Sequence, residues 1–131
     1  MYNIGINKVI TLNKGDTFEY KYKIDLGWDF NNRYHTYTSR YYTMQEGDHL
    51  YFALMQPNQV FEGAIVKKIY DVSDFEEDHV NIKLDSDDTW YLTDGKYYYT
   101  IKLERFLYTD EENNNHYEVI TTQPNTLFFL V

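Results

Sequence analysis

The sequence predicts an all-β protein, a single sandwich domain over residues 1–131 with seven to nine short strands and at most one short helical turn. Two observations lead to this prediction. Several stretches alternate apolar and polar residues, as strands with one buried face do, and helical periodicity is almost absent. Turn residues also bound each of these stretches, and the strongly aromatic composition, with 15 Tyr and 8 Phe but only 6 Gly and 2 Pro, is not that of a disordered chain.

The most regular predicted strand covers residues 97–104 and follows the turn pair Asp94-Gly95. Tyr97 begins one face of this strand, which Tyr99 and later apolar residues continue. The spacing Asp94-Gly95-x-Tyr97 matches the start of the sixth strand in immunoglobulin-like sandwiches, where a corner tyrosine bonds the preceding backbone. The chain has no cysteine, so this antiparallel sandwich must be held by apolar packing alone.

The strands before this one follow from the same alternation. Residues 6–12 and 17–24 are the first two, separated by the turn residues 13–16. Gly47-Asp48 opens a core strand at residues 49–55, which Pro57-Asn58 closes. Further strands are expected at residues 64–70 and 80–84.

A helical turn is predicted at residues 85–89, because carboxylates there suit the N-terminus of a helix. We expect Trp90 and Leu92 to plug the end of the core beneath it. After the strand at residues 97–104, residues 109–115 form a polar hairpin tip, and a strand returns near Tyr117.

The closing strand, residues 126–131, is apolar on both faces. We expect Leu127, Phe129 and Val131 to enter the core. In a seven-stranded sandwich the last strand lies near a sheet edge, which would leave Phe128 and Leu130 facing outward. An apolar edge of this kind is covered either by the connection at residues 28–44 or by another subunit, and we predict the subunit.

The connection at residues 28–44 has no clean period and is expected to be long, with room for one extra strand. Its acid-free run, residues 33–42, is rich in Tyr and Arg, which are enriched in protein interfaces. The alternative is that these tyrosines pack over the edge of the sandwich. Together with the closing strand, the candidate partner-binding residues are Trp28, Tyr34, Tyr37, Tyr41, Phe128 and Leu130.

The formal net charge of −9 is concentrated in the second half of the chain. Residues 1–65 hold six basic and seven acidic side chains, whereas residues 66–131 hold six and fourteen, a net of −8. Such a surface repels phosphate backbones, so we expect no nucleic-acid partner. No stretch is apolar enough to predict a membrane span, and residues 1–5 lack the features of a secretion signal. The absence of cysteine is typical of a reducing compartment.

No motif predicts catalysis or a cofactor. Ser39, Ser73 and Ser86 lack a nucleophile elbow, and there is no glycine-rich phosphate loop. The acidic run at residues 85–94 fails the calcium-loop pattern, because Thr89 and Trp90 stand where an oxygen ligand and a glycine are needed. A surface calcium site of another geometry stays open. The four histidines lie in four separate segments, so we predict no metal site, no catalytic residue and no enzyme activity.

Several short motifs resemble the N-terminal domain of phage baseplate upper proteins. They are residues 9–12 with 15–18, residues 48–54, Asp88-Thr89 with Leu92…Gly95-x-Tyr97, and the closing strand. The resemblance runs over nearly the whole chain and implies an immunoglobulin-like domain that anchors a protein in the phage tail. The chain departs from that pattern in its longer connection at residues 28–44 and in stopping at Val131.

The resemblance therefore implies a stand-alone, non-enzymatic structural or adaptor module of a phage tail or baseplate. Its expected partners are other virion proteins or copies of itself, as a homo-oligomer, and it would reach the virion after assembly in the bacterial cytoplasm. The alternative is a carbohydrate-binding sandwich, in which Trp28, Tyr34, Tyr37 and Tyr41 stack on sugar rings beside a structural calcium ion. A planar row of exposed tyrosines favours this alternative, and a contiguous apolar patch favours the structural role.

Overall fold

The structure, a computed structural model, describes residues 2–131, apart from the side chains of residues 28–31 and 37–39. The described chain is all-β, with one short helix, α1 (Ser86–Thr89), and two 3-10 turns at Phe61–Gly63 and Val72–Asp74. It contains ten strands rather than seven to nine. They are β1 (Tyr2–Ile4), β2 (Ile10–Leu12), β3 (Phe18–Lys23), β4 (Asp25–Asn31), β5 (Thr36–Tyr41), β6 (His49–Met55), β7 (Val66–Tyr70), β8 (His79–Leu84), β9 (Gly95–Thr109) and β10 (Asn115–Leu130).

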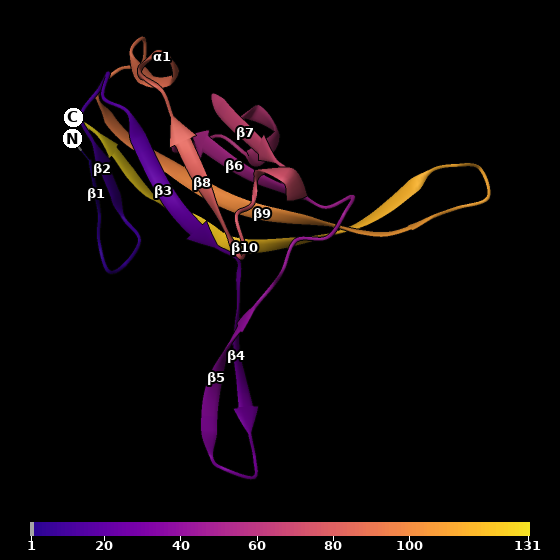
Figure 1. The fold of residues 1–131 in the computed structure, drawn as a ribbon. Coiled ribbons are helices and arrows are strands. Elements are labelled where there is room, and N and C mark those ends of the chain that lie inside the picture. The colour runs from indigo at the N-terminus through magenta and orange to yellow at the C-terminus, as the bar shows by residue number, and fades with distance from the viewer. Residues whose placement is uncertain (1) are drawn as a thin grey trace.

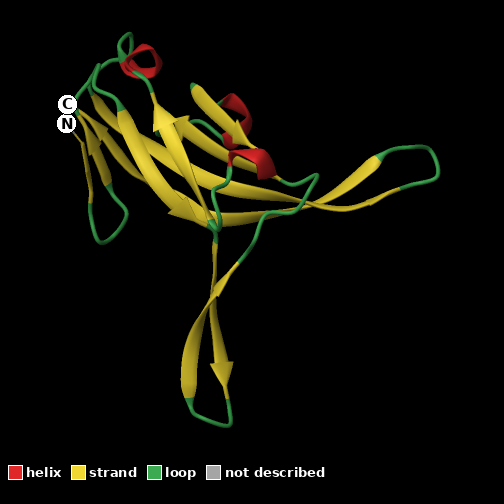
Figure 2. Ribbon diagram, in the orientation of Figure 1, coloured by secondary structure: helices red, strands yellow, loops and turns green. Residues whose placement is uncertain are grey.

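Most strands form two layers (Figures 1 and 2). The larger sheet has the order β1-β2-β10-β9-β6-β7, and the smaller sheet pairs β3 with β8. Strand β10 therefore lies inside the larger sheet, between β2 and β9. All pairs are antiparallel except β2 with β10, which is parallel.

The core lies between the two layers. Phe18 from the small sheet meets Phe128 from the large one in an edge-to-face contact of 6.2 Å between ring centroids. Phe52 and Tyr99, which are fully buried, stack at 5.6 Å on the large sheet. The Tyr99 hydroxyl is satisfied because it donates to the Lys8 carbonyl oxygen at 2.5 Å, so this polar group can be buried without an unpaired donor.

The predicted corner tyrosine is confirmed. Tyr97 is buried, and its hydroxyl donates to the Thr93 carbonyl oxygen at 2.6 Å. Gly95, which precedes it, adopts a φ of +147°, a conformation that Cβ-bearing residues rarely take. The turn pair therefore allows the chain to enter β9 with the tyrosine pointing back over the corner.

Removing this hydroxyl with Tyr97→Phe should lower the free energy of unfolding by about 1–2 kcal/mol, because the Thr93 carbonyl loses its donor. Denaturant titration measures the loss. Tyr98→Phe is the matched control, since the Tyr98 hydroxyl has no hydrogen bond within the described residues. Equal stabilities of the two variants would show that the corner bond contributes nothing.

The helical turn is confirmed, but the side chains after it differ from expectation. The Asp85 backbone N–H donates to Asp88 Oδ2 at 2.7 Å, which caps the turn. Leu92 is buried as predicted, whereas the prediction for Trp90 is wrong because 68 % of it is exposed. The Trp90 ring lies over Gly15, where a Cβ would stand 2.9 Å from the ring. Leu92 and Thr89 are the buried side chains at this end, and the indole covers the turn from outside.

The prediction that Phe128 and Leu130 face outward is also wrong. Phe128 is 0 % exposed, Leu130 is equally buried, and Val131 is the exposed residue of the segment. The reason is the position of β10, which lies between β9 and β2 rather than near an edge. Phe128 pairs with Ile10 and Leu130 with Leu12, so all four side chains belong to the core face of the sheet. Neither Phe128 nor Leu130 is available to a partner.

Two hairpins extend beyond the sandwich (Figure 1). The first, β4–β5, is the segment expected to be a long connection with room for one strand, and it contains two strands instead. The second is the distal part of β9–β10, whose pairing continues out to Thr109 and Asn115. Within the described residues no helix has the length and apolar character needed to cross a membrane.

Candidate partner-binding surface

The β4–β5 hairpin is attached to the sandwich at a narrow base. Tyr42 donates its backbone N–H to the Ile24 carbonyl oxygen at 3.0 Å, which closes the pair of chains that leave the body. Just beyond, Asp25 Oδ1 accepts the Gly27 backbone N–H at 2.8 Å, and Gly27 has a φ of +102°. This irregularity, a register shift between Asp25 and Trp28, separates the hairpin from the regular sheet. The hairpin therefore projects away from the body (Figure 1).

The structure separates the predicted contact residues. Tyr34 lies at the tip, 64 % exposed, with the Arg33 guanidinium 5.5 Å from its ring centroid. Tyr41 lies at the base, 49 % exposed, with Lys23 Nζ 4.2 Å from its ring centroid. The side chains of Trp28 and Tyr37 lie outside the described residues. Because Tyr34 and Tyr41 stand at opposite ends of the hairpin, these two rings do not form one stacking platform.

Asp48 ties the base of both hairpins to the body, a role that sequence reasoning missed. Its carboxylate is 1 % exposed and accepts three hydrogen bonds: from the Tyr42 hydroxyl at 2.5 Å, the Gln45 N–H at 2.9 Å and the Phe106 N–H at 2.8 Å. Burial and this carboxylate raise the pKa of Tyr42 to about 12. The sequence signal was only the turn pair Gly47-Asp48, which does not show a bond to a residue 58 positions away.

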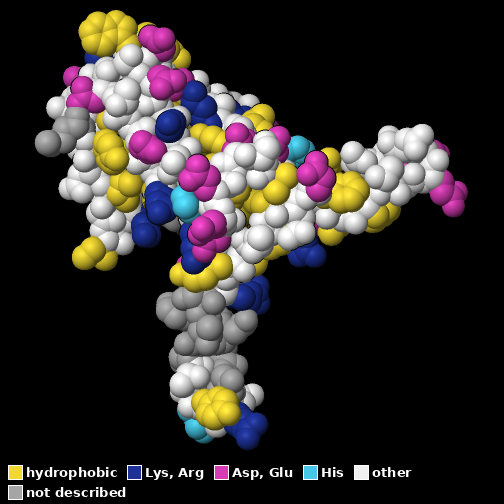
Figure 3. All heavy atoms as spheres, in the orientation of Figure 1, with side chains coloured by type: hydrophobic (Ala, Val, Ile, Leu, Met, Phe, Trp, Pro, Cys, Tyr) yellow, Lys and Arg dark blue, Asp and Glu magenta, His cyan; other side chains and the backbone are white. Residues whose placement is uncertain are grey.

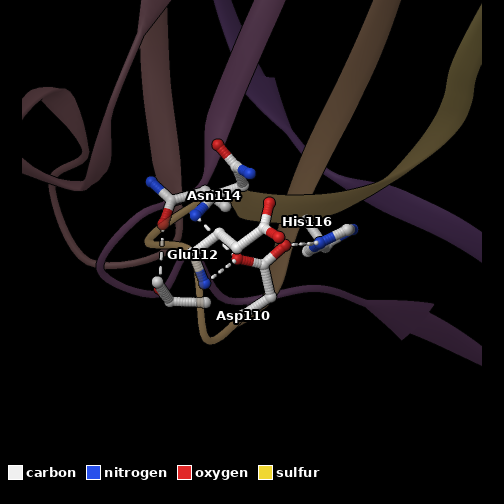
Figure 4. Close-up of polar contacts among 6 residues, drawn as sticks. Asp110, Glu112, Asn114 and His116 are labelled. Carbon is white, nitrogen blue, oxygen red and sulfur yellow. Dashed lines mark hydrogen bonds and ion pairs between the residues drawn. The ribbon is translucent and has the colours of Figure 1, made fainter.

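The second hairpin has an ordered polar tip. Asp110 Oδ2 lies 2.8 Å from His116 Nε2 (Figure 4). Asp110 Oδ1 accepts hydrogen bonds from the backbone N–H groups of Glu112 and Asn114, each at 2.9 Å. The His116 contact, and after it the backbone hydrogen bonds, hold the pKa of Asp110 below its ordinary value. The tip is polar, as predicted.

The arm behind this tip exposes the large side chains of Leu107 and Tyr108, which were not among the predicted contact residues. Leu107, Tyr108 and Val119 are exposed large side chains on paired strands. The Tyr108 ring stacks on His116 with 4.5 Å between centroids. The sequence signal for this exposed surface was the apolar pair Leu107-Tyr108, which follows the predicted core strand at residues 97–104. Exposed apolar side chains on a projecting arm suit contact with another protein.

A cleft of about 680 Å³ opens between β3 and β10, beside the base of the β4–β5 hairpin. Basic and acidic side chains both lie around the base of this hairpin (Figure 3). Ile120 and Leu26 contribute apolar walls, and Asp25 and Glu118 are its two carboxylates. Its basic lining residues are Lys8, Lys21, Lys23, Arg40 and Arg105.

Two of the cleft's cations are already paired: Lys23 with Asp78 at 2.8 Å, and Arg105 with Glu118 at 3.7 Å. Lys8 and Lys21 form no ion pair with any side chain that the structure describes. The cleft therefore keeps positive charge available in a protein whose net charge is −9.

The acidic run and the histidines were the candidates for metal binding. Asp88 pairs with Lys68 at 2.9 Å and Asp94 with Lys14 at 3.5 Å. Among the described side chains, no group of three or more His, Asp or Glu is arranged to hold a metal ion. That the protein holds no metal ion and is not an enzyme stays a prediction from the sequence.

Comparison with protein-family models, with curated proteins and with solved structures found no match.

Proposed function

We propose that this chain is a non-enzymatic adaptor module of a phage tail or baseplate that acts by protein–protein assembly. The observation that carries the proposal is the β4–β5 hairpin, which projects from the sandwich with Arg33 and Tyr34 exposed at its tip. A two-stranded hairpin gains little stability in water by itself. Contact with a partner protein would stabilise the hairpin and bury the exposed Tyr34 ring.

The second arm supports the same function. Leu107 and Tyr108 expose large side chains beyond Glu104, where β9 no longer pairs with β6, and solvent exposure gives no stabilisation in return. Two arms that leave one compact sandwich in different directions can contact two neighbours (Figure 1). An adaptor requires such an arrangement, because a rigid domain must hold its contact surfaces apart.

The assignment to a phage virion rests on the short motifs that resemble baseplate upper proteins. The motif residues in the turn at Asp94-Gly95 and in β6 form the corner and the centre of the sandwich. They support a domain of that architecture, and the projecting hairpins supply the surfaces for assembly. The carbohydrate-binding alternative is less favoured, since Tyr34 and Tyr41 stand far apart on the hairpin.

The test is incorporation into virions of the phage that encodes the chain. A variant that joins Ile24 to Tyr42 through an Asn-Gly turn removes the β4–β5 hairpin and keeps their backbone hydrogen bond. We expect its thermal unfolding to match the wild type and its amount in purified virions, measured by mass spectrometry, to fall by about tenfold or more.

The matched controls separate tip contacts from the hairpin as a whole. Arg33→Ala with Tyr34→Ala should reduce incorporation, whereas Asn58→Ala, in an exposed turn of the body, should not. Absence of the wild-type chain from virions would contradict the proposed function. Wild-type incorporation of the hairpin-less variant would show that the hairpin is not the contact surface.

A further inference from the structure

We propose that copies of this chain associate head to tail, the α1 end of one copy entering the basic cleft of the next. The α1 end consists of Trp90 and Tyr91 with the carboxylates Asp85 and Asp87. The basic cleft is the cleft between β3 and β10 described above. The inference rests on the proposed function only in taking the domain to act by protein–protein assembly.

The α1 end has the composition of an interface centre. Trp90 and Tyr91 are 68 % and 70 % exposed, and Trp and Tyr are the residues that most often dominate binding energy at protein interfaces. Hydrophobic and acidic side chains lie together at this end of the molecule (Figure 3). Asp87 has no ion pair among the described side chains. The surface therefore offers two aromatic rings together with negative charge.

The basic cleft complements this end in size and chemistry. Its volume of about 680 Å³ is in the range of sites that bury a drug-sized molecule, so two aromatic side chains fit. Its walls combine Leu26 and Ile120 with lysine and arginine side chains. Lysine and arginine attract both carboxylates and the faces of indole and phenol rings.

Charge complementarity points to a second copy of the chain. At the α1 end Asp88 pairs with Lys68 and Asp94 with Lys14, so Asp85 and Asp87 carry its available negative charge. The basic cleft holds five basic side chains and two carboxylates. One molecule thus carries both a negatively and a positively charged surface. These surfaces attract each other between copies, rather than within one copy, only if they lie far apart on the molecule.

The two surfaces do lie apart. Strand β3 runs from the α1 end to the base of the β4–β5 hairpin, where the basic cleft opens (Figure 1). One molecule cannot fill its own cleft with its own α1 end. Because the contact joins two different surfaces, every open chain of copies keeps one free α1 end and one free cleft. The chain can therefore grow into a filament or close into a ring.

Sedimentation velocity of the purified protein tests the proposal. In about 25 mM salt the wild type should associate as its concentration rises, and association should weaken at about 0.5 M salt, where charges are screened. Trp90→Ala with Tyr91→Ala removes the α1 contact, and Lys8→Glu with Lys21→Glu reverses charge in the cleft. Each double variant should weaken association by about tenfold or more. Lys67→Glu with Lys96→Glu is the matched charge control, because it changes the net charge by the same amount at residues outside the two surfaces. Any weakening of association in this control measures the general repulsion between more acidic molecules, and we expect it to be smaller than in the cleft variant.

Mixing the two double variants gives the decisive measurement, because each retains the surface that the other lacks. We expect the mixture to form 1:1 dimers and nothing larger. Failure of the mixture to dimerise, a wild type that stays monomeric at low salt, or unchanged association of the cleft variant would each overturn the proposal. Circular dichroism establishes that the variants are folded. Virion incorporation is measured in a separate experiment. A negative result for self-association therefore does not contradict the role of the hairpin in virions, and a negative result for incorporation does not contradict self-association.

Discussion

Replacing Phe128 by alanine should lower the free energy of unfolding by about 3–5 kcal/mol, the range found when a buried aromatic side chain is truncated. Phe128 is fully buried and contacts Phe18 across the layers at 6.2 Å and Tyr99 within its own sheet at 6.5 Å. The cavity left by the ring would open between the two sheets. Since small domains have about 5–15 kcal/mol of total stability, this loss is a large fraction of the total.

Guanidinium unfolding measures this loss, with Phe129→Ala as the matched control on the other face of β10. Phe129 is only partly buried, so its truncation should cost less. Light scattering gives a second check. If Phe128 is core, Phe128→Ala changes stability without changing the mass of the folded species. A lower mass with unchanged stability would place the ring in an interface instead, contrary to the structure.

Replacing Asp48 by alanine should cost about 3–5 kcal/mol, because three donors lose their acceptor at once. Hydrogen bonds to a charged group contribute about 1.5–3 kcal/mol each, and buried donors without a partner are costly. The Phe106 and Gln45 backbone N–H groups and the Tyr42 hydroxyl all converge on this carboxylate. Their loss should also loosen the bases of both hairpins.

Denaturant titration and hydrogen exchange at the Phe106 amide measure the two effects. Asp48→Asn keeps one oxygen acceptor and should cost less than alanine. Glu46→Ala removes an exposed carboxylate from the same turn and should change stability by about 0.5 kcal/mol or less. Unchanged protection of the Phe106 amide in Asp48→Ala would contradict the proposed role of the carboxylate.

The sequence by itself determined the features that depend on neighbouring residues. Alternation placed Phe18, Tyr20 and Tyr22 on the inward face of β3, because successive side chains of a strand point to opposite sides. The spacing Asp94-Gly95-x-Tyr97 predicted the corner bond, which spans four positions. The carboxylates at residues 85–88 predicted the capped turn. In each case the interacting groups are close in the chain.

The tertiary structure alone decided the features that join distant segments. Alternation along β10 shows that Phe128 and Phe129 face opposite ways, but which one is buried depends on parallel pairing with β2, more than a hundred residues earlier. The basic cleft likewise gathers Lys8, Lys21 and Arg105 from separate elements. Local periodicity carries no information about which strands become neighbours, and that choice is made by burying the most apolar surface of the whole chain at once.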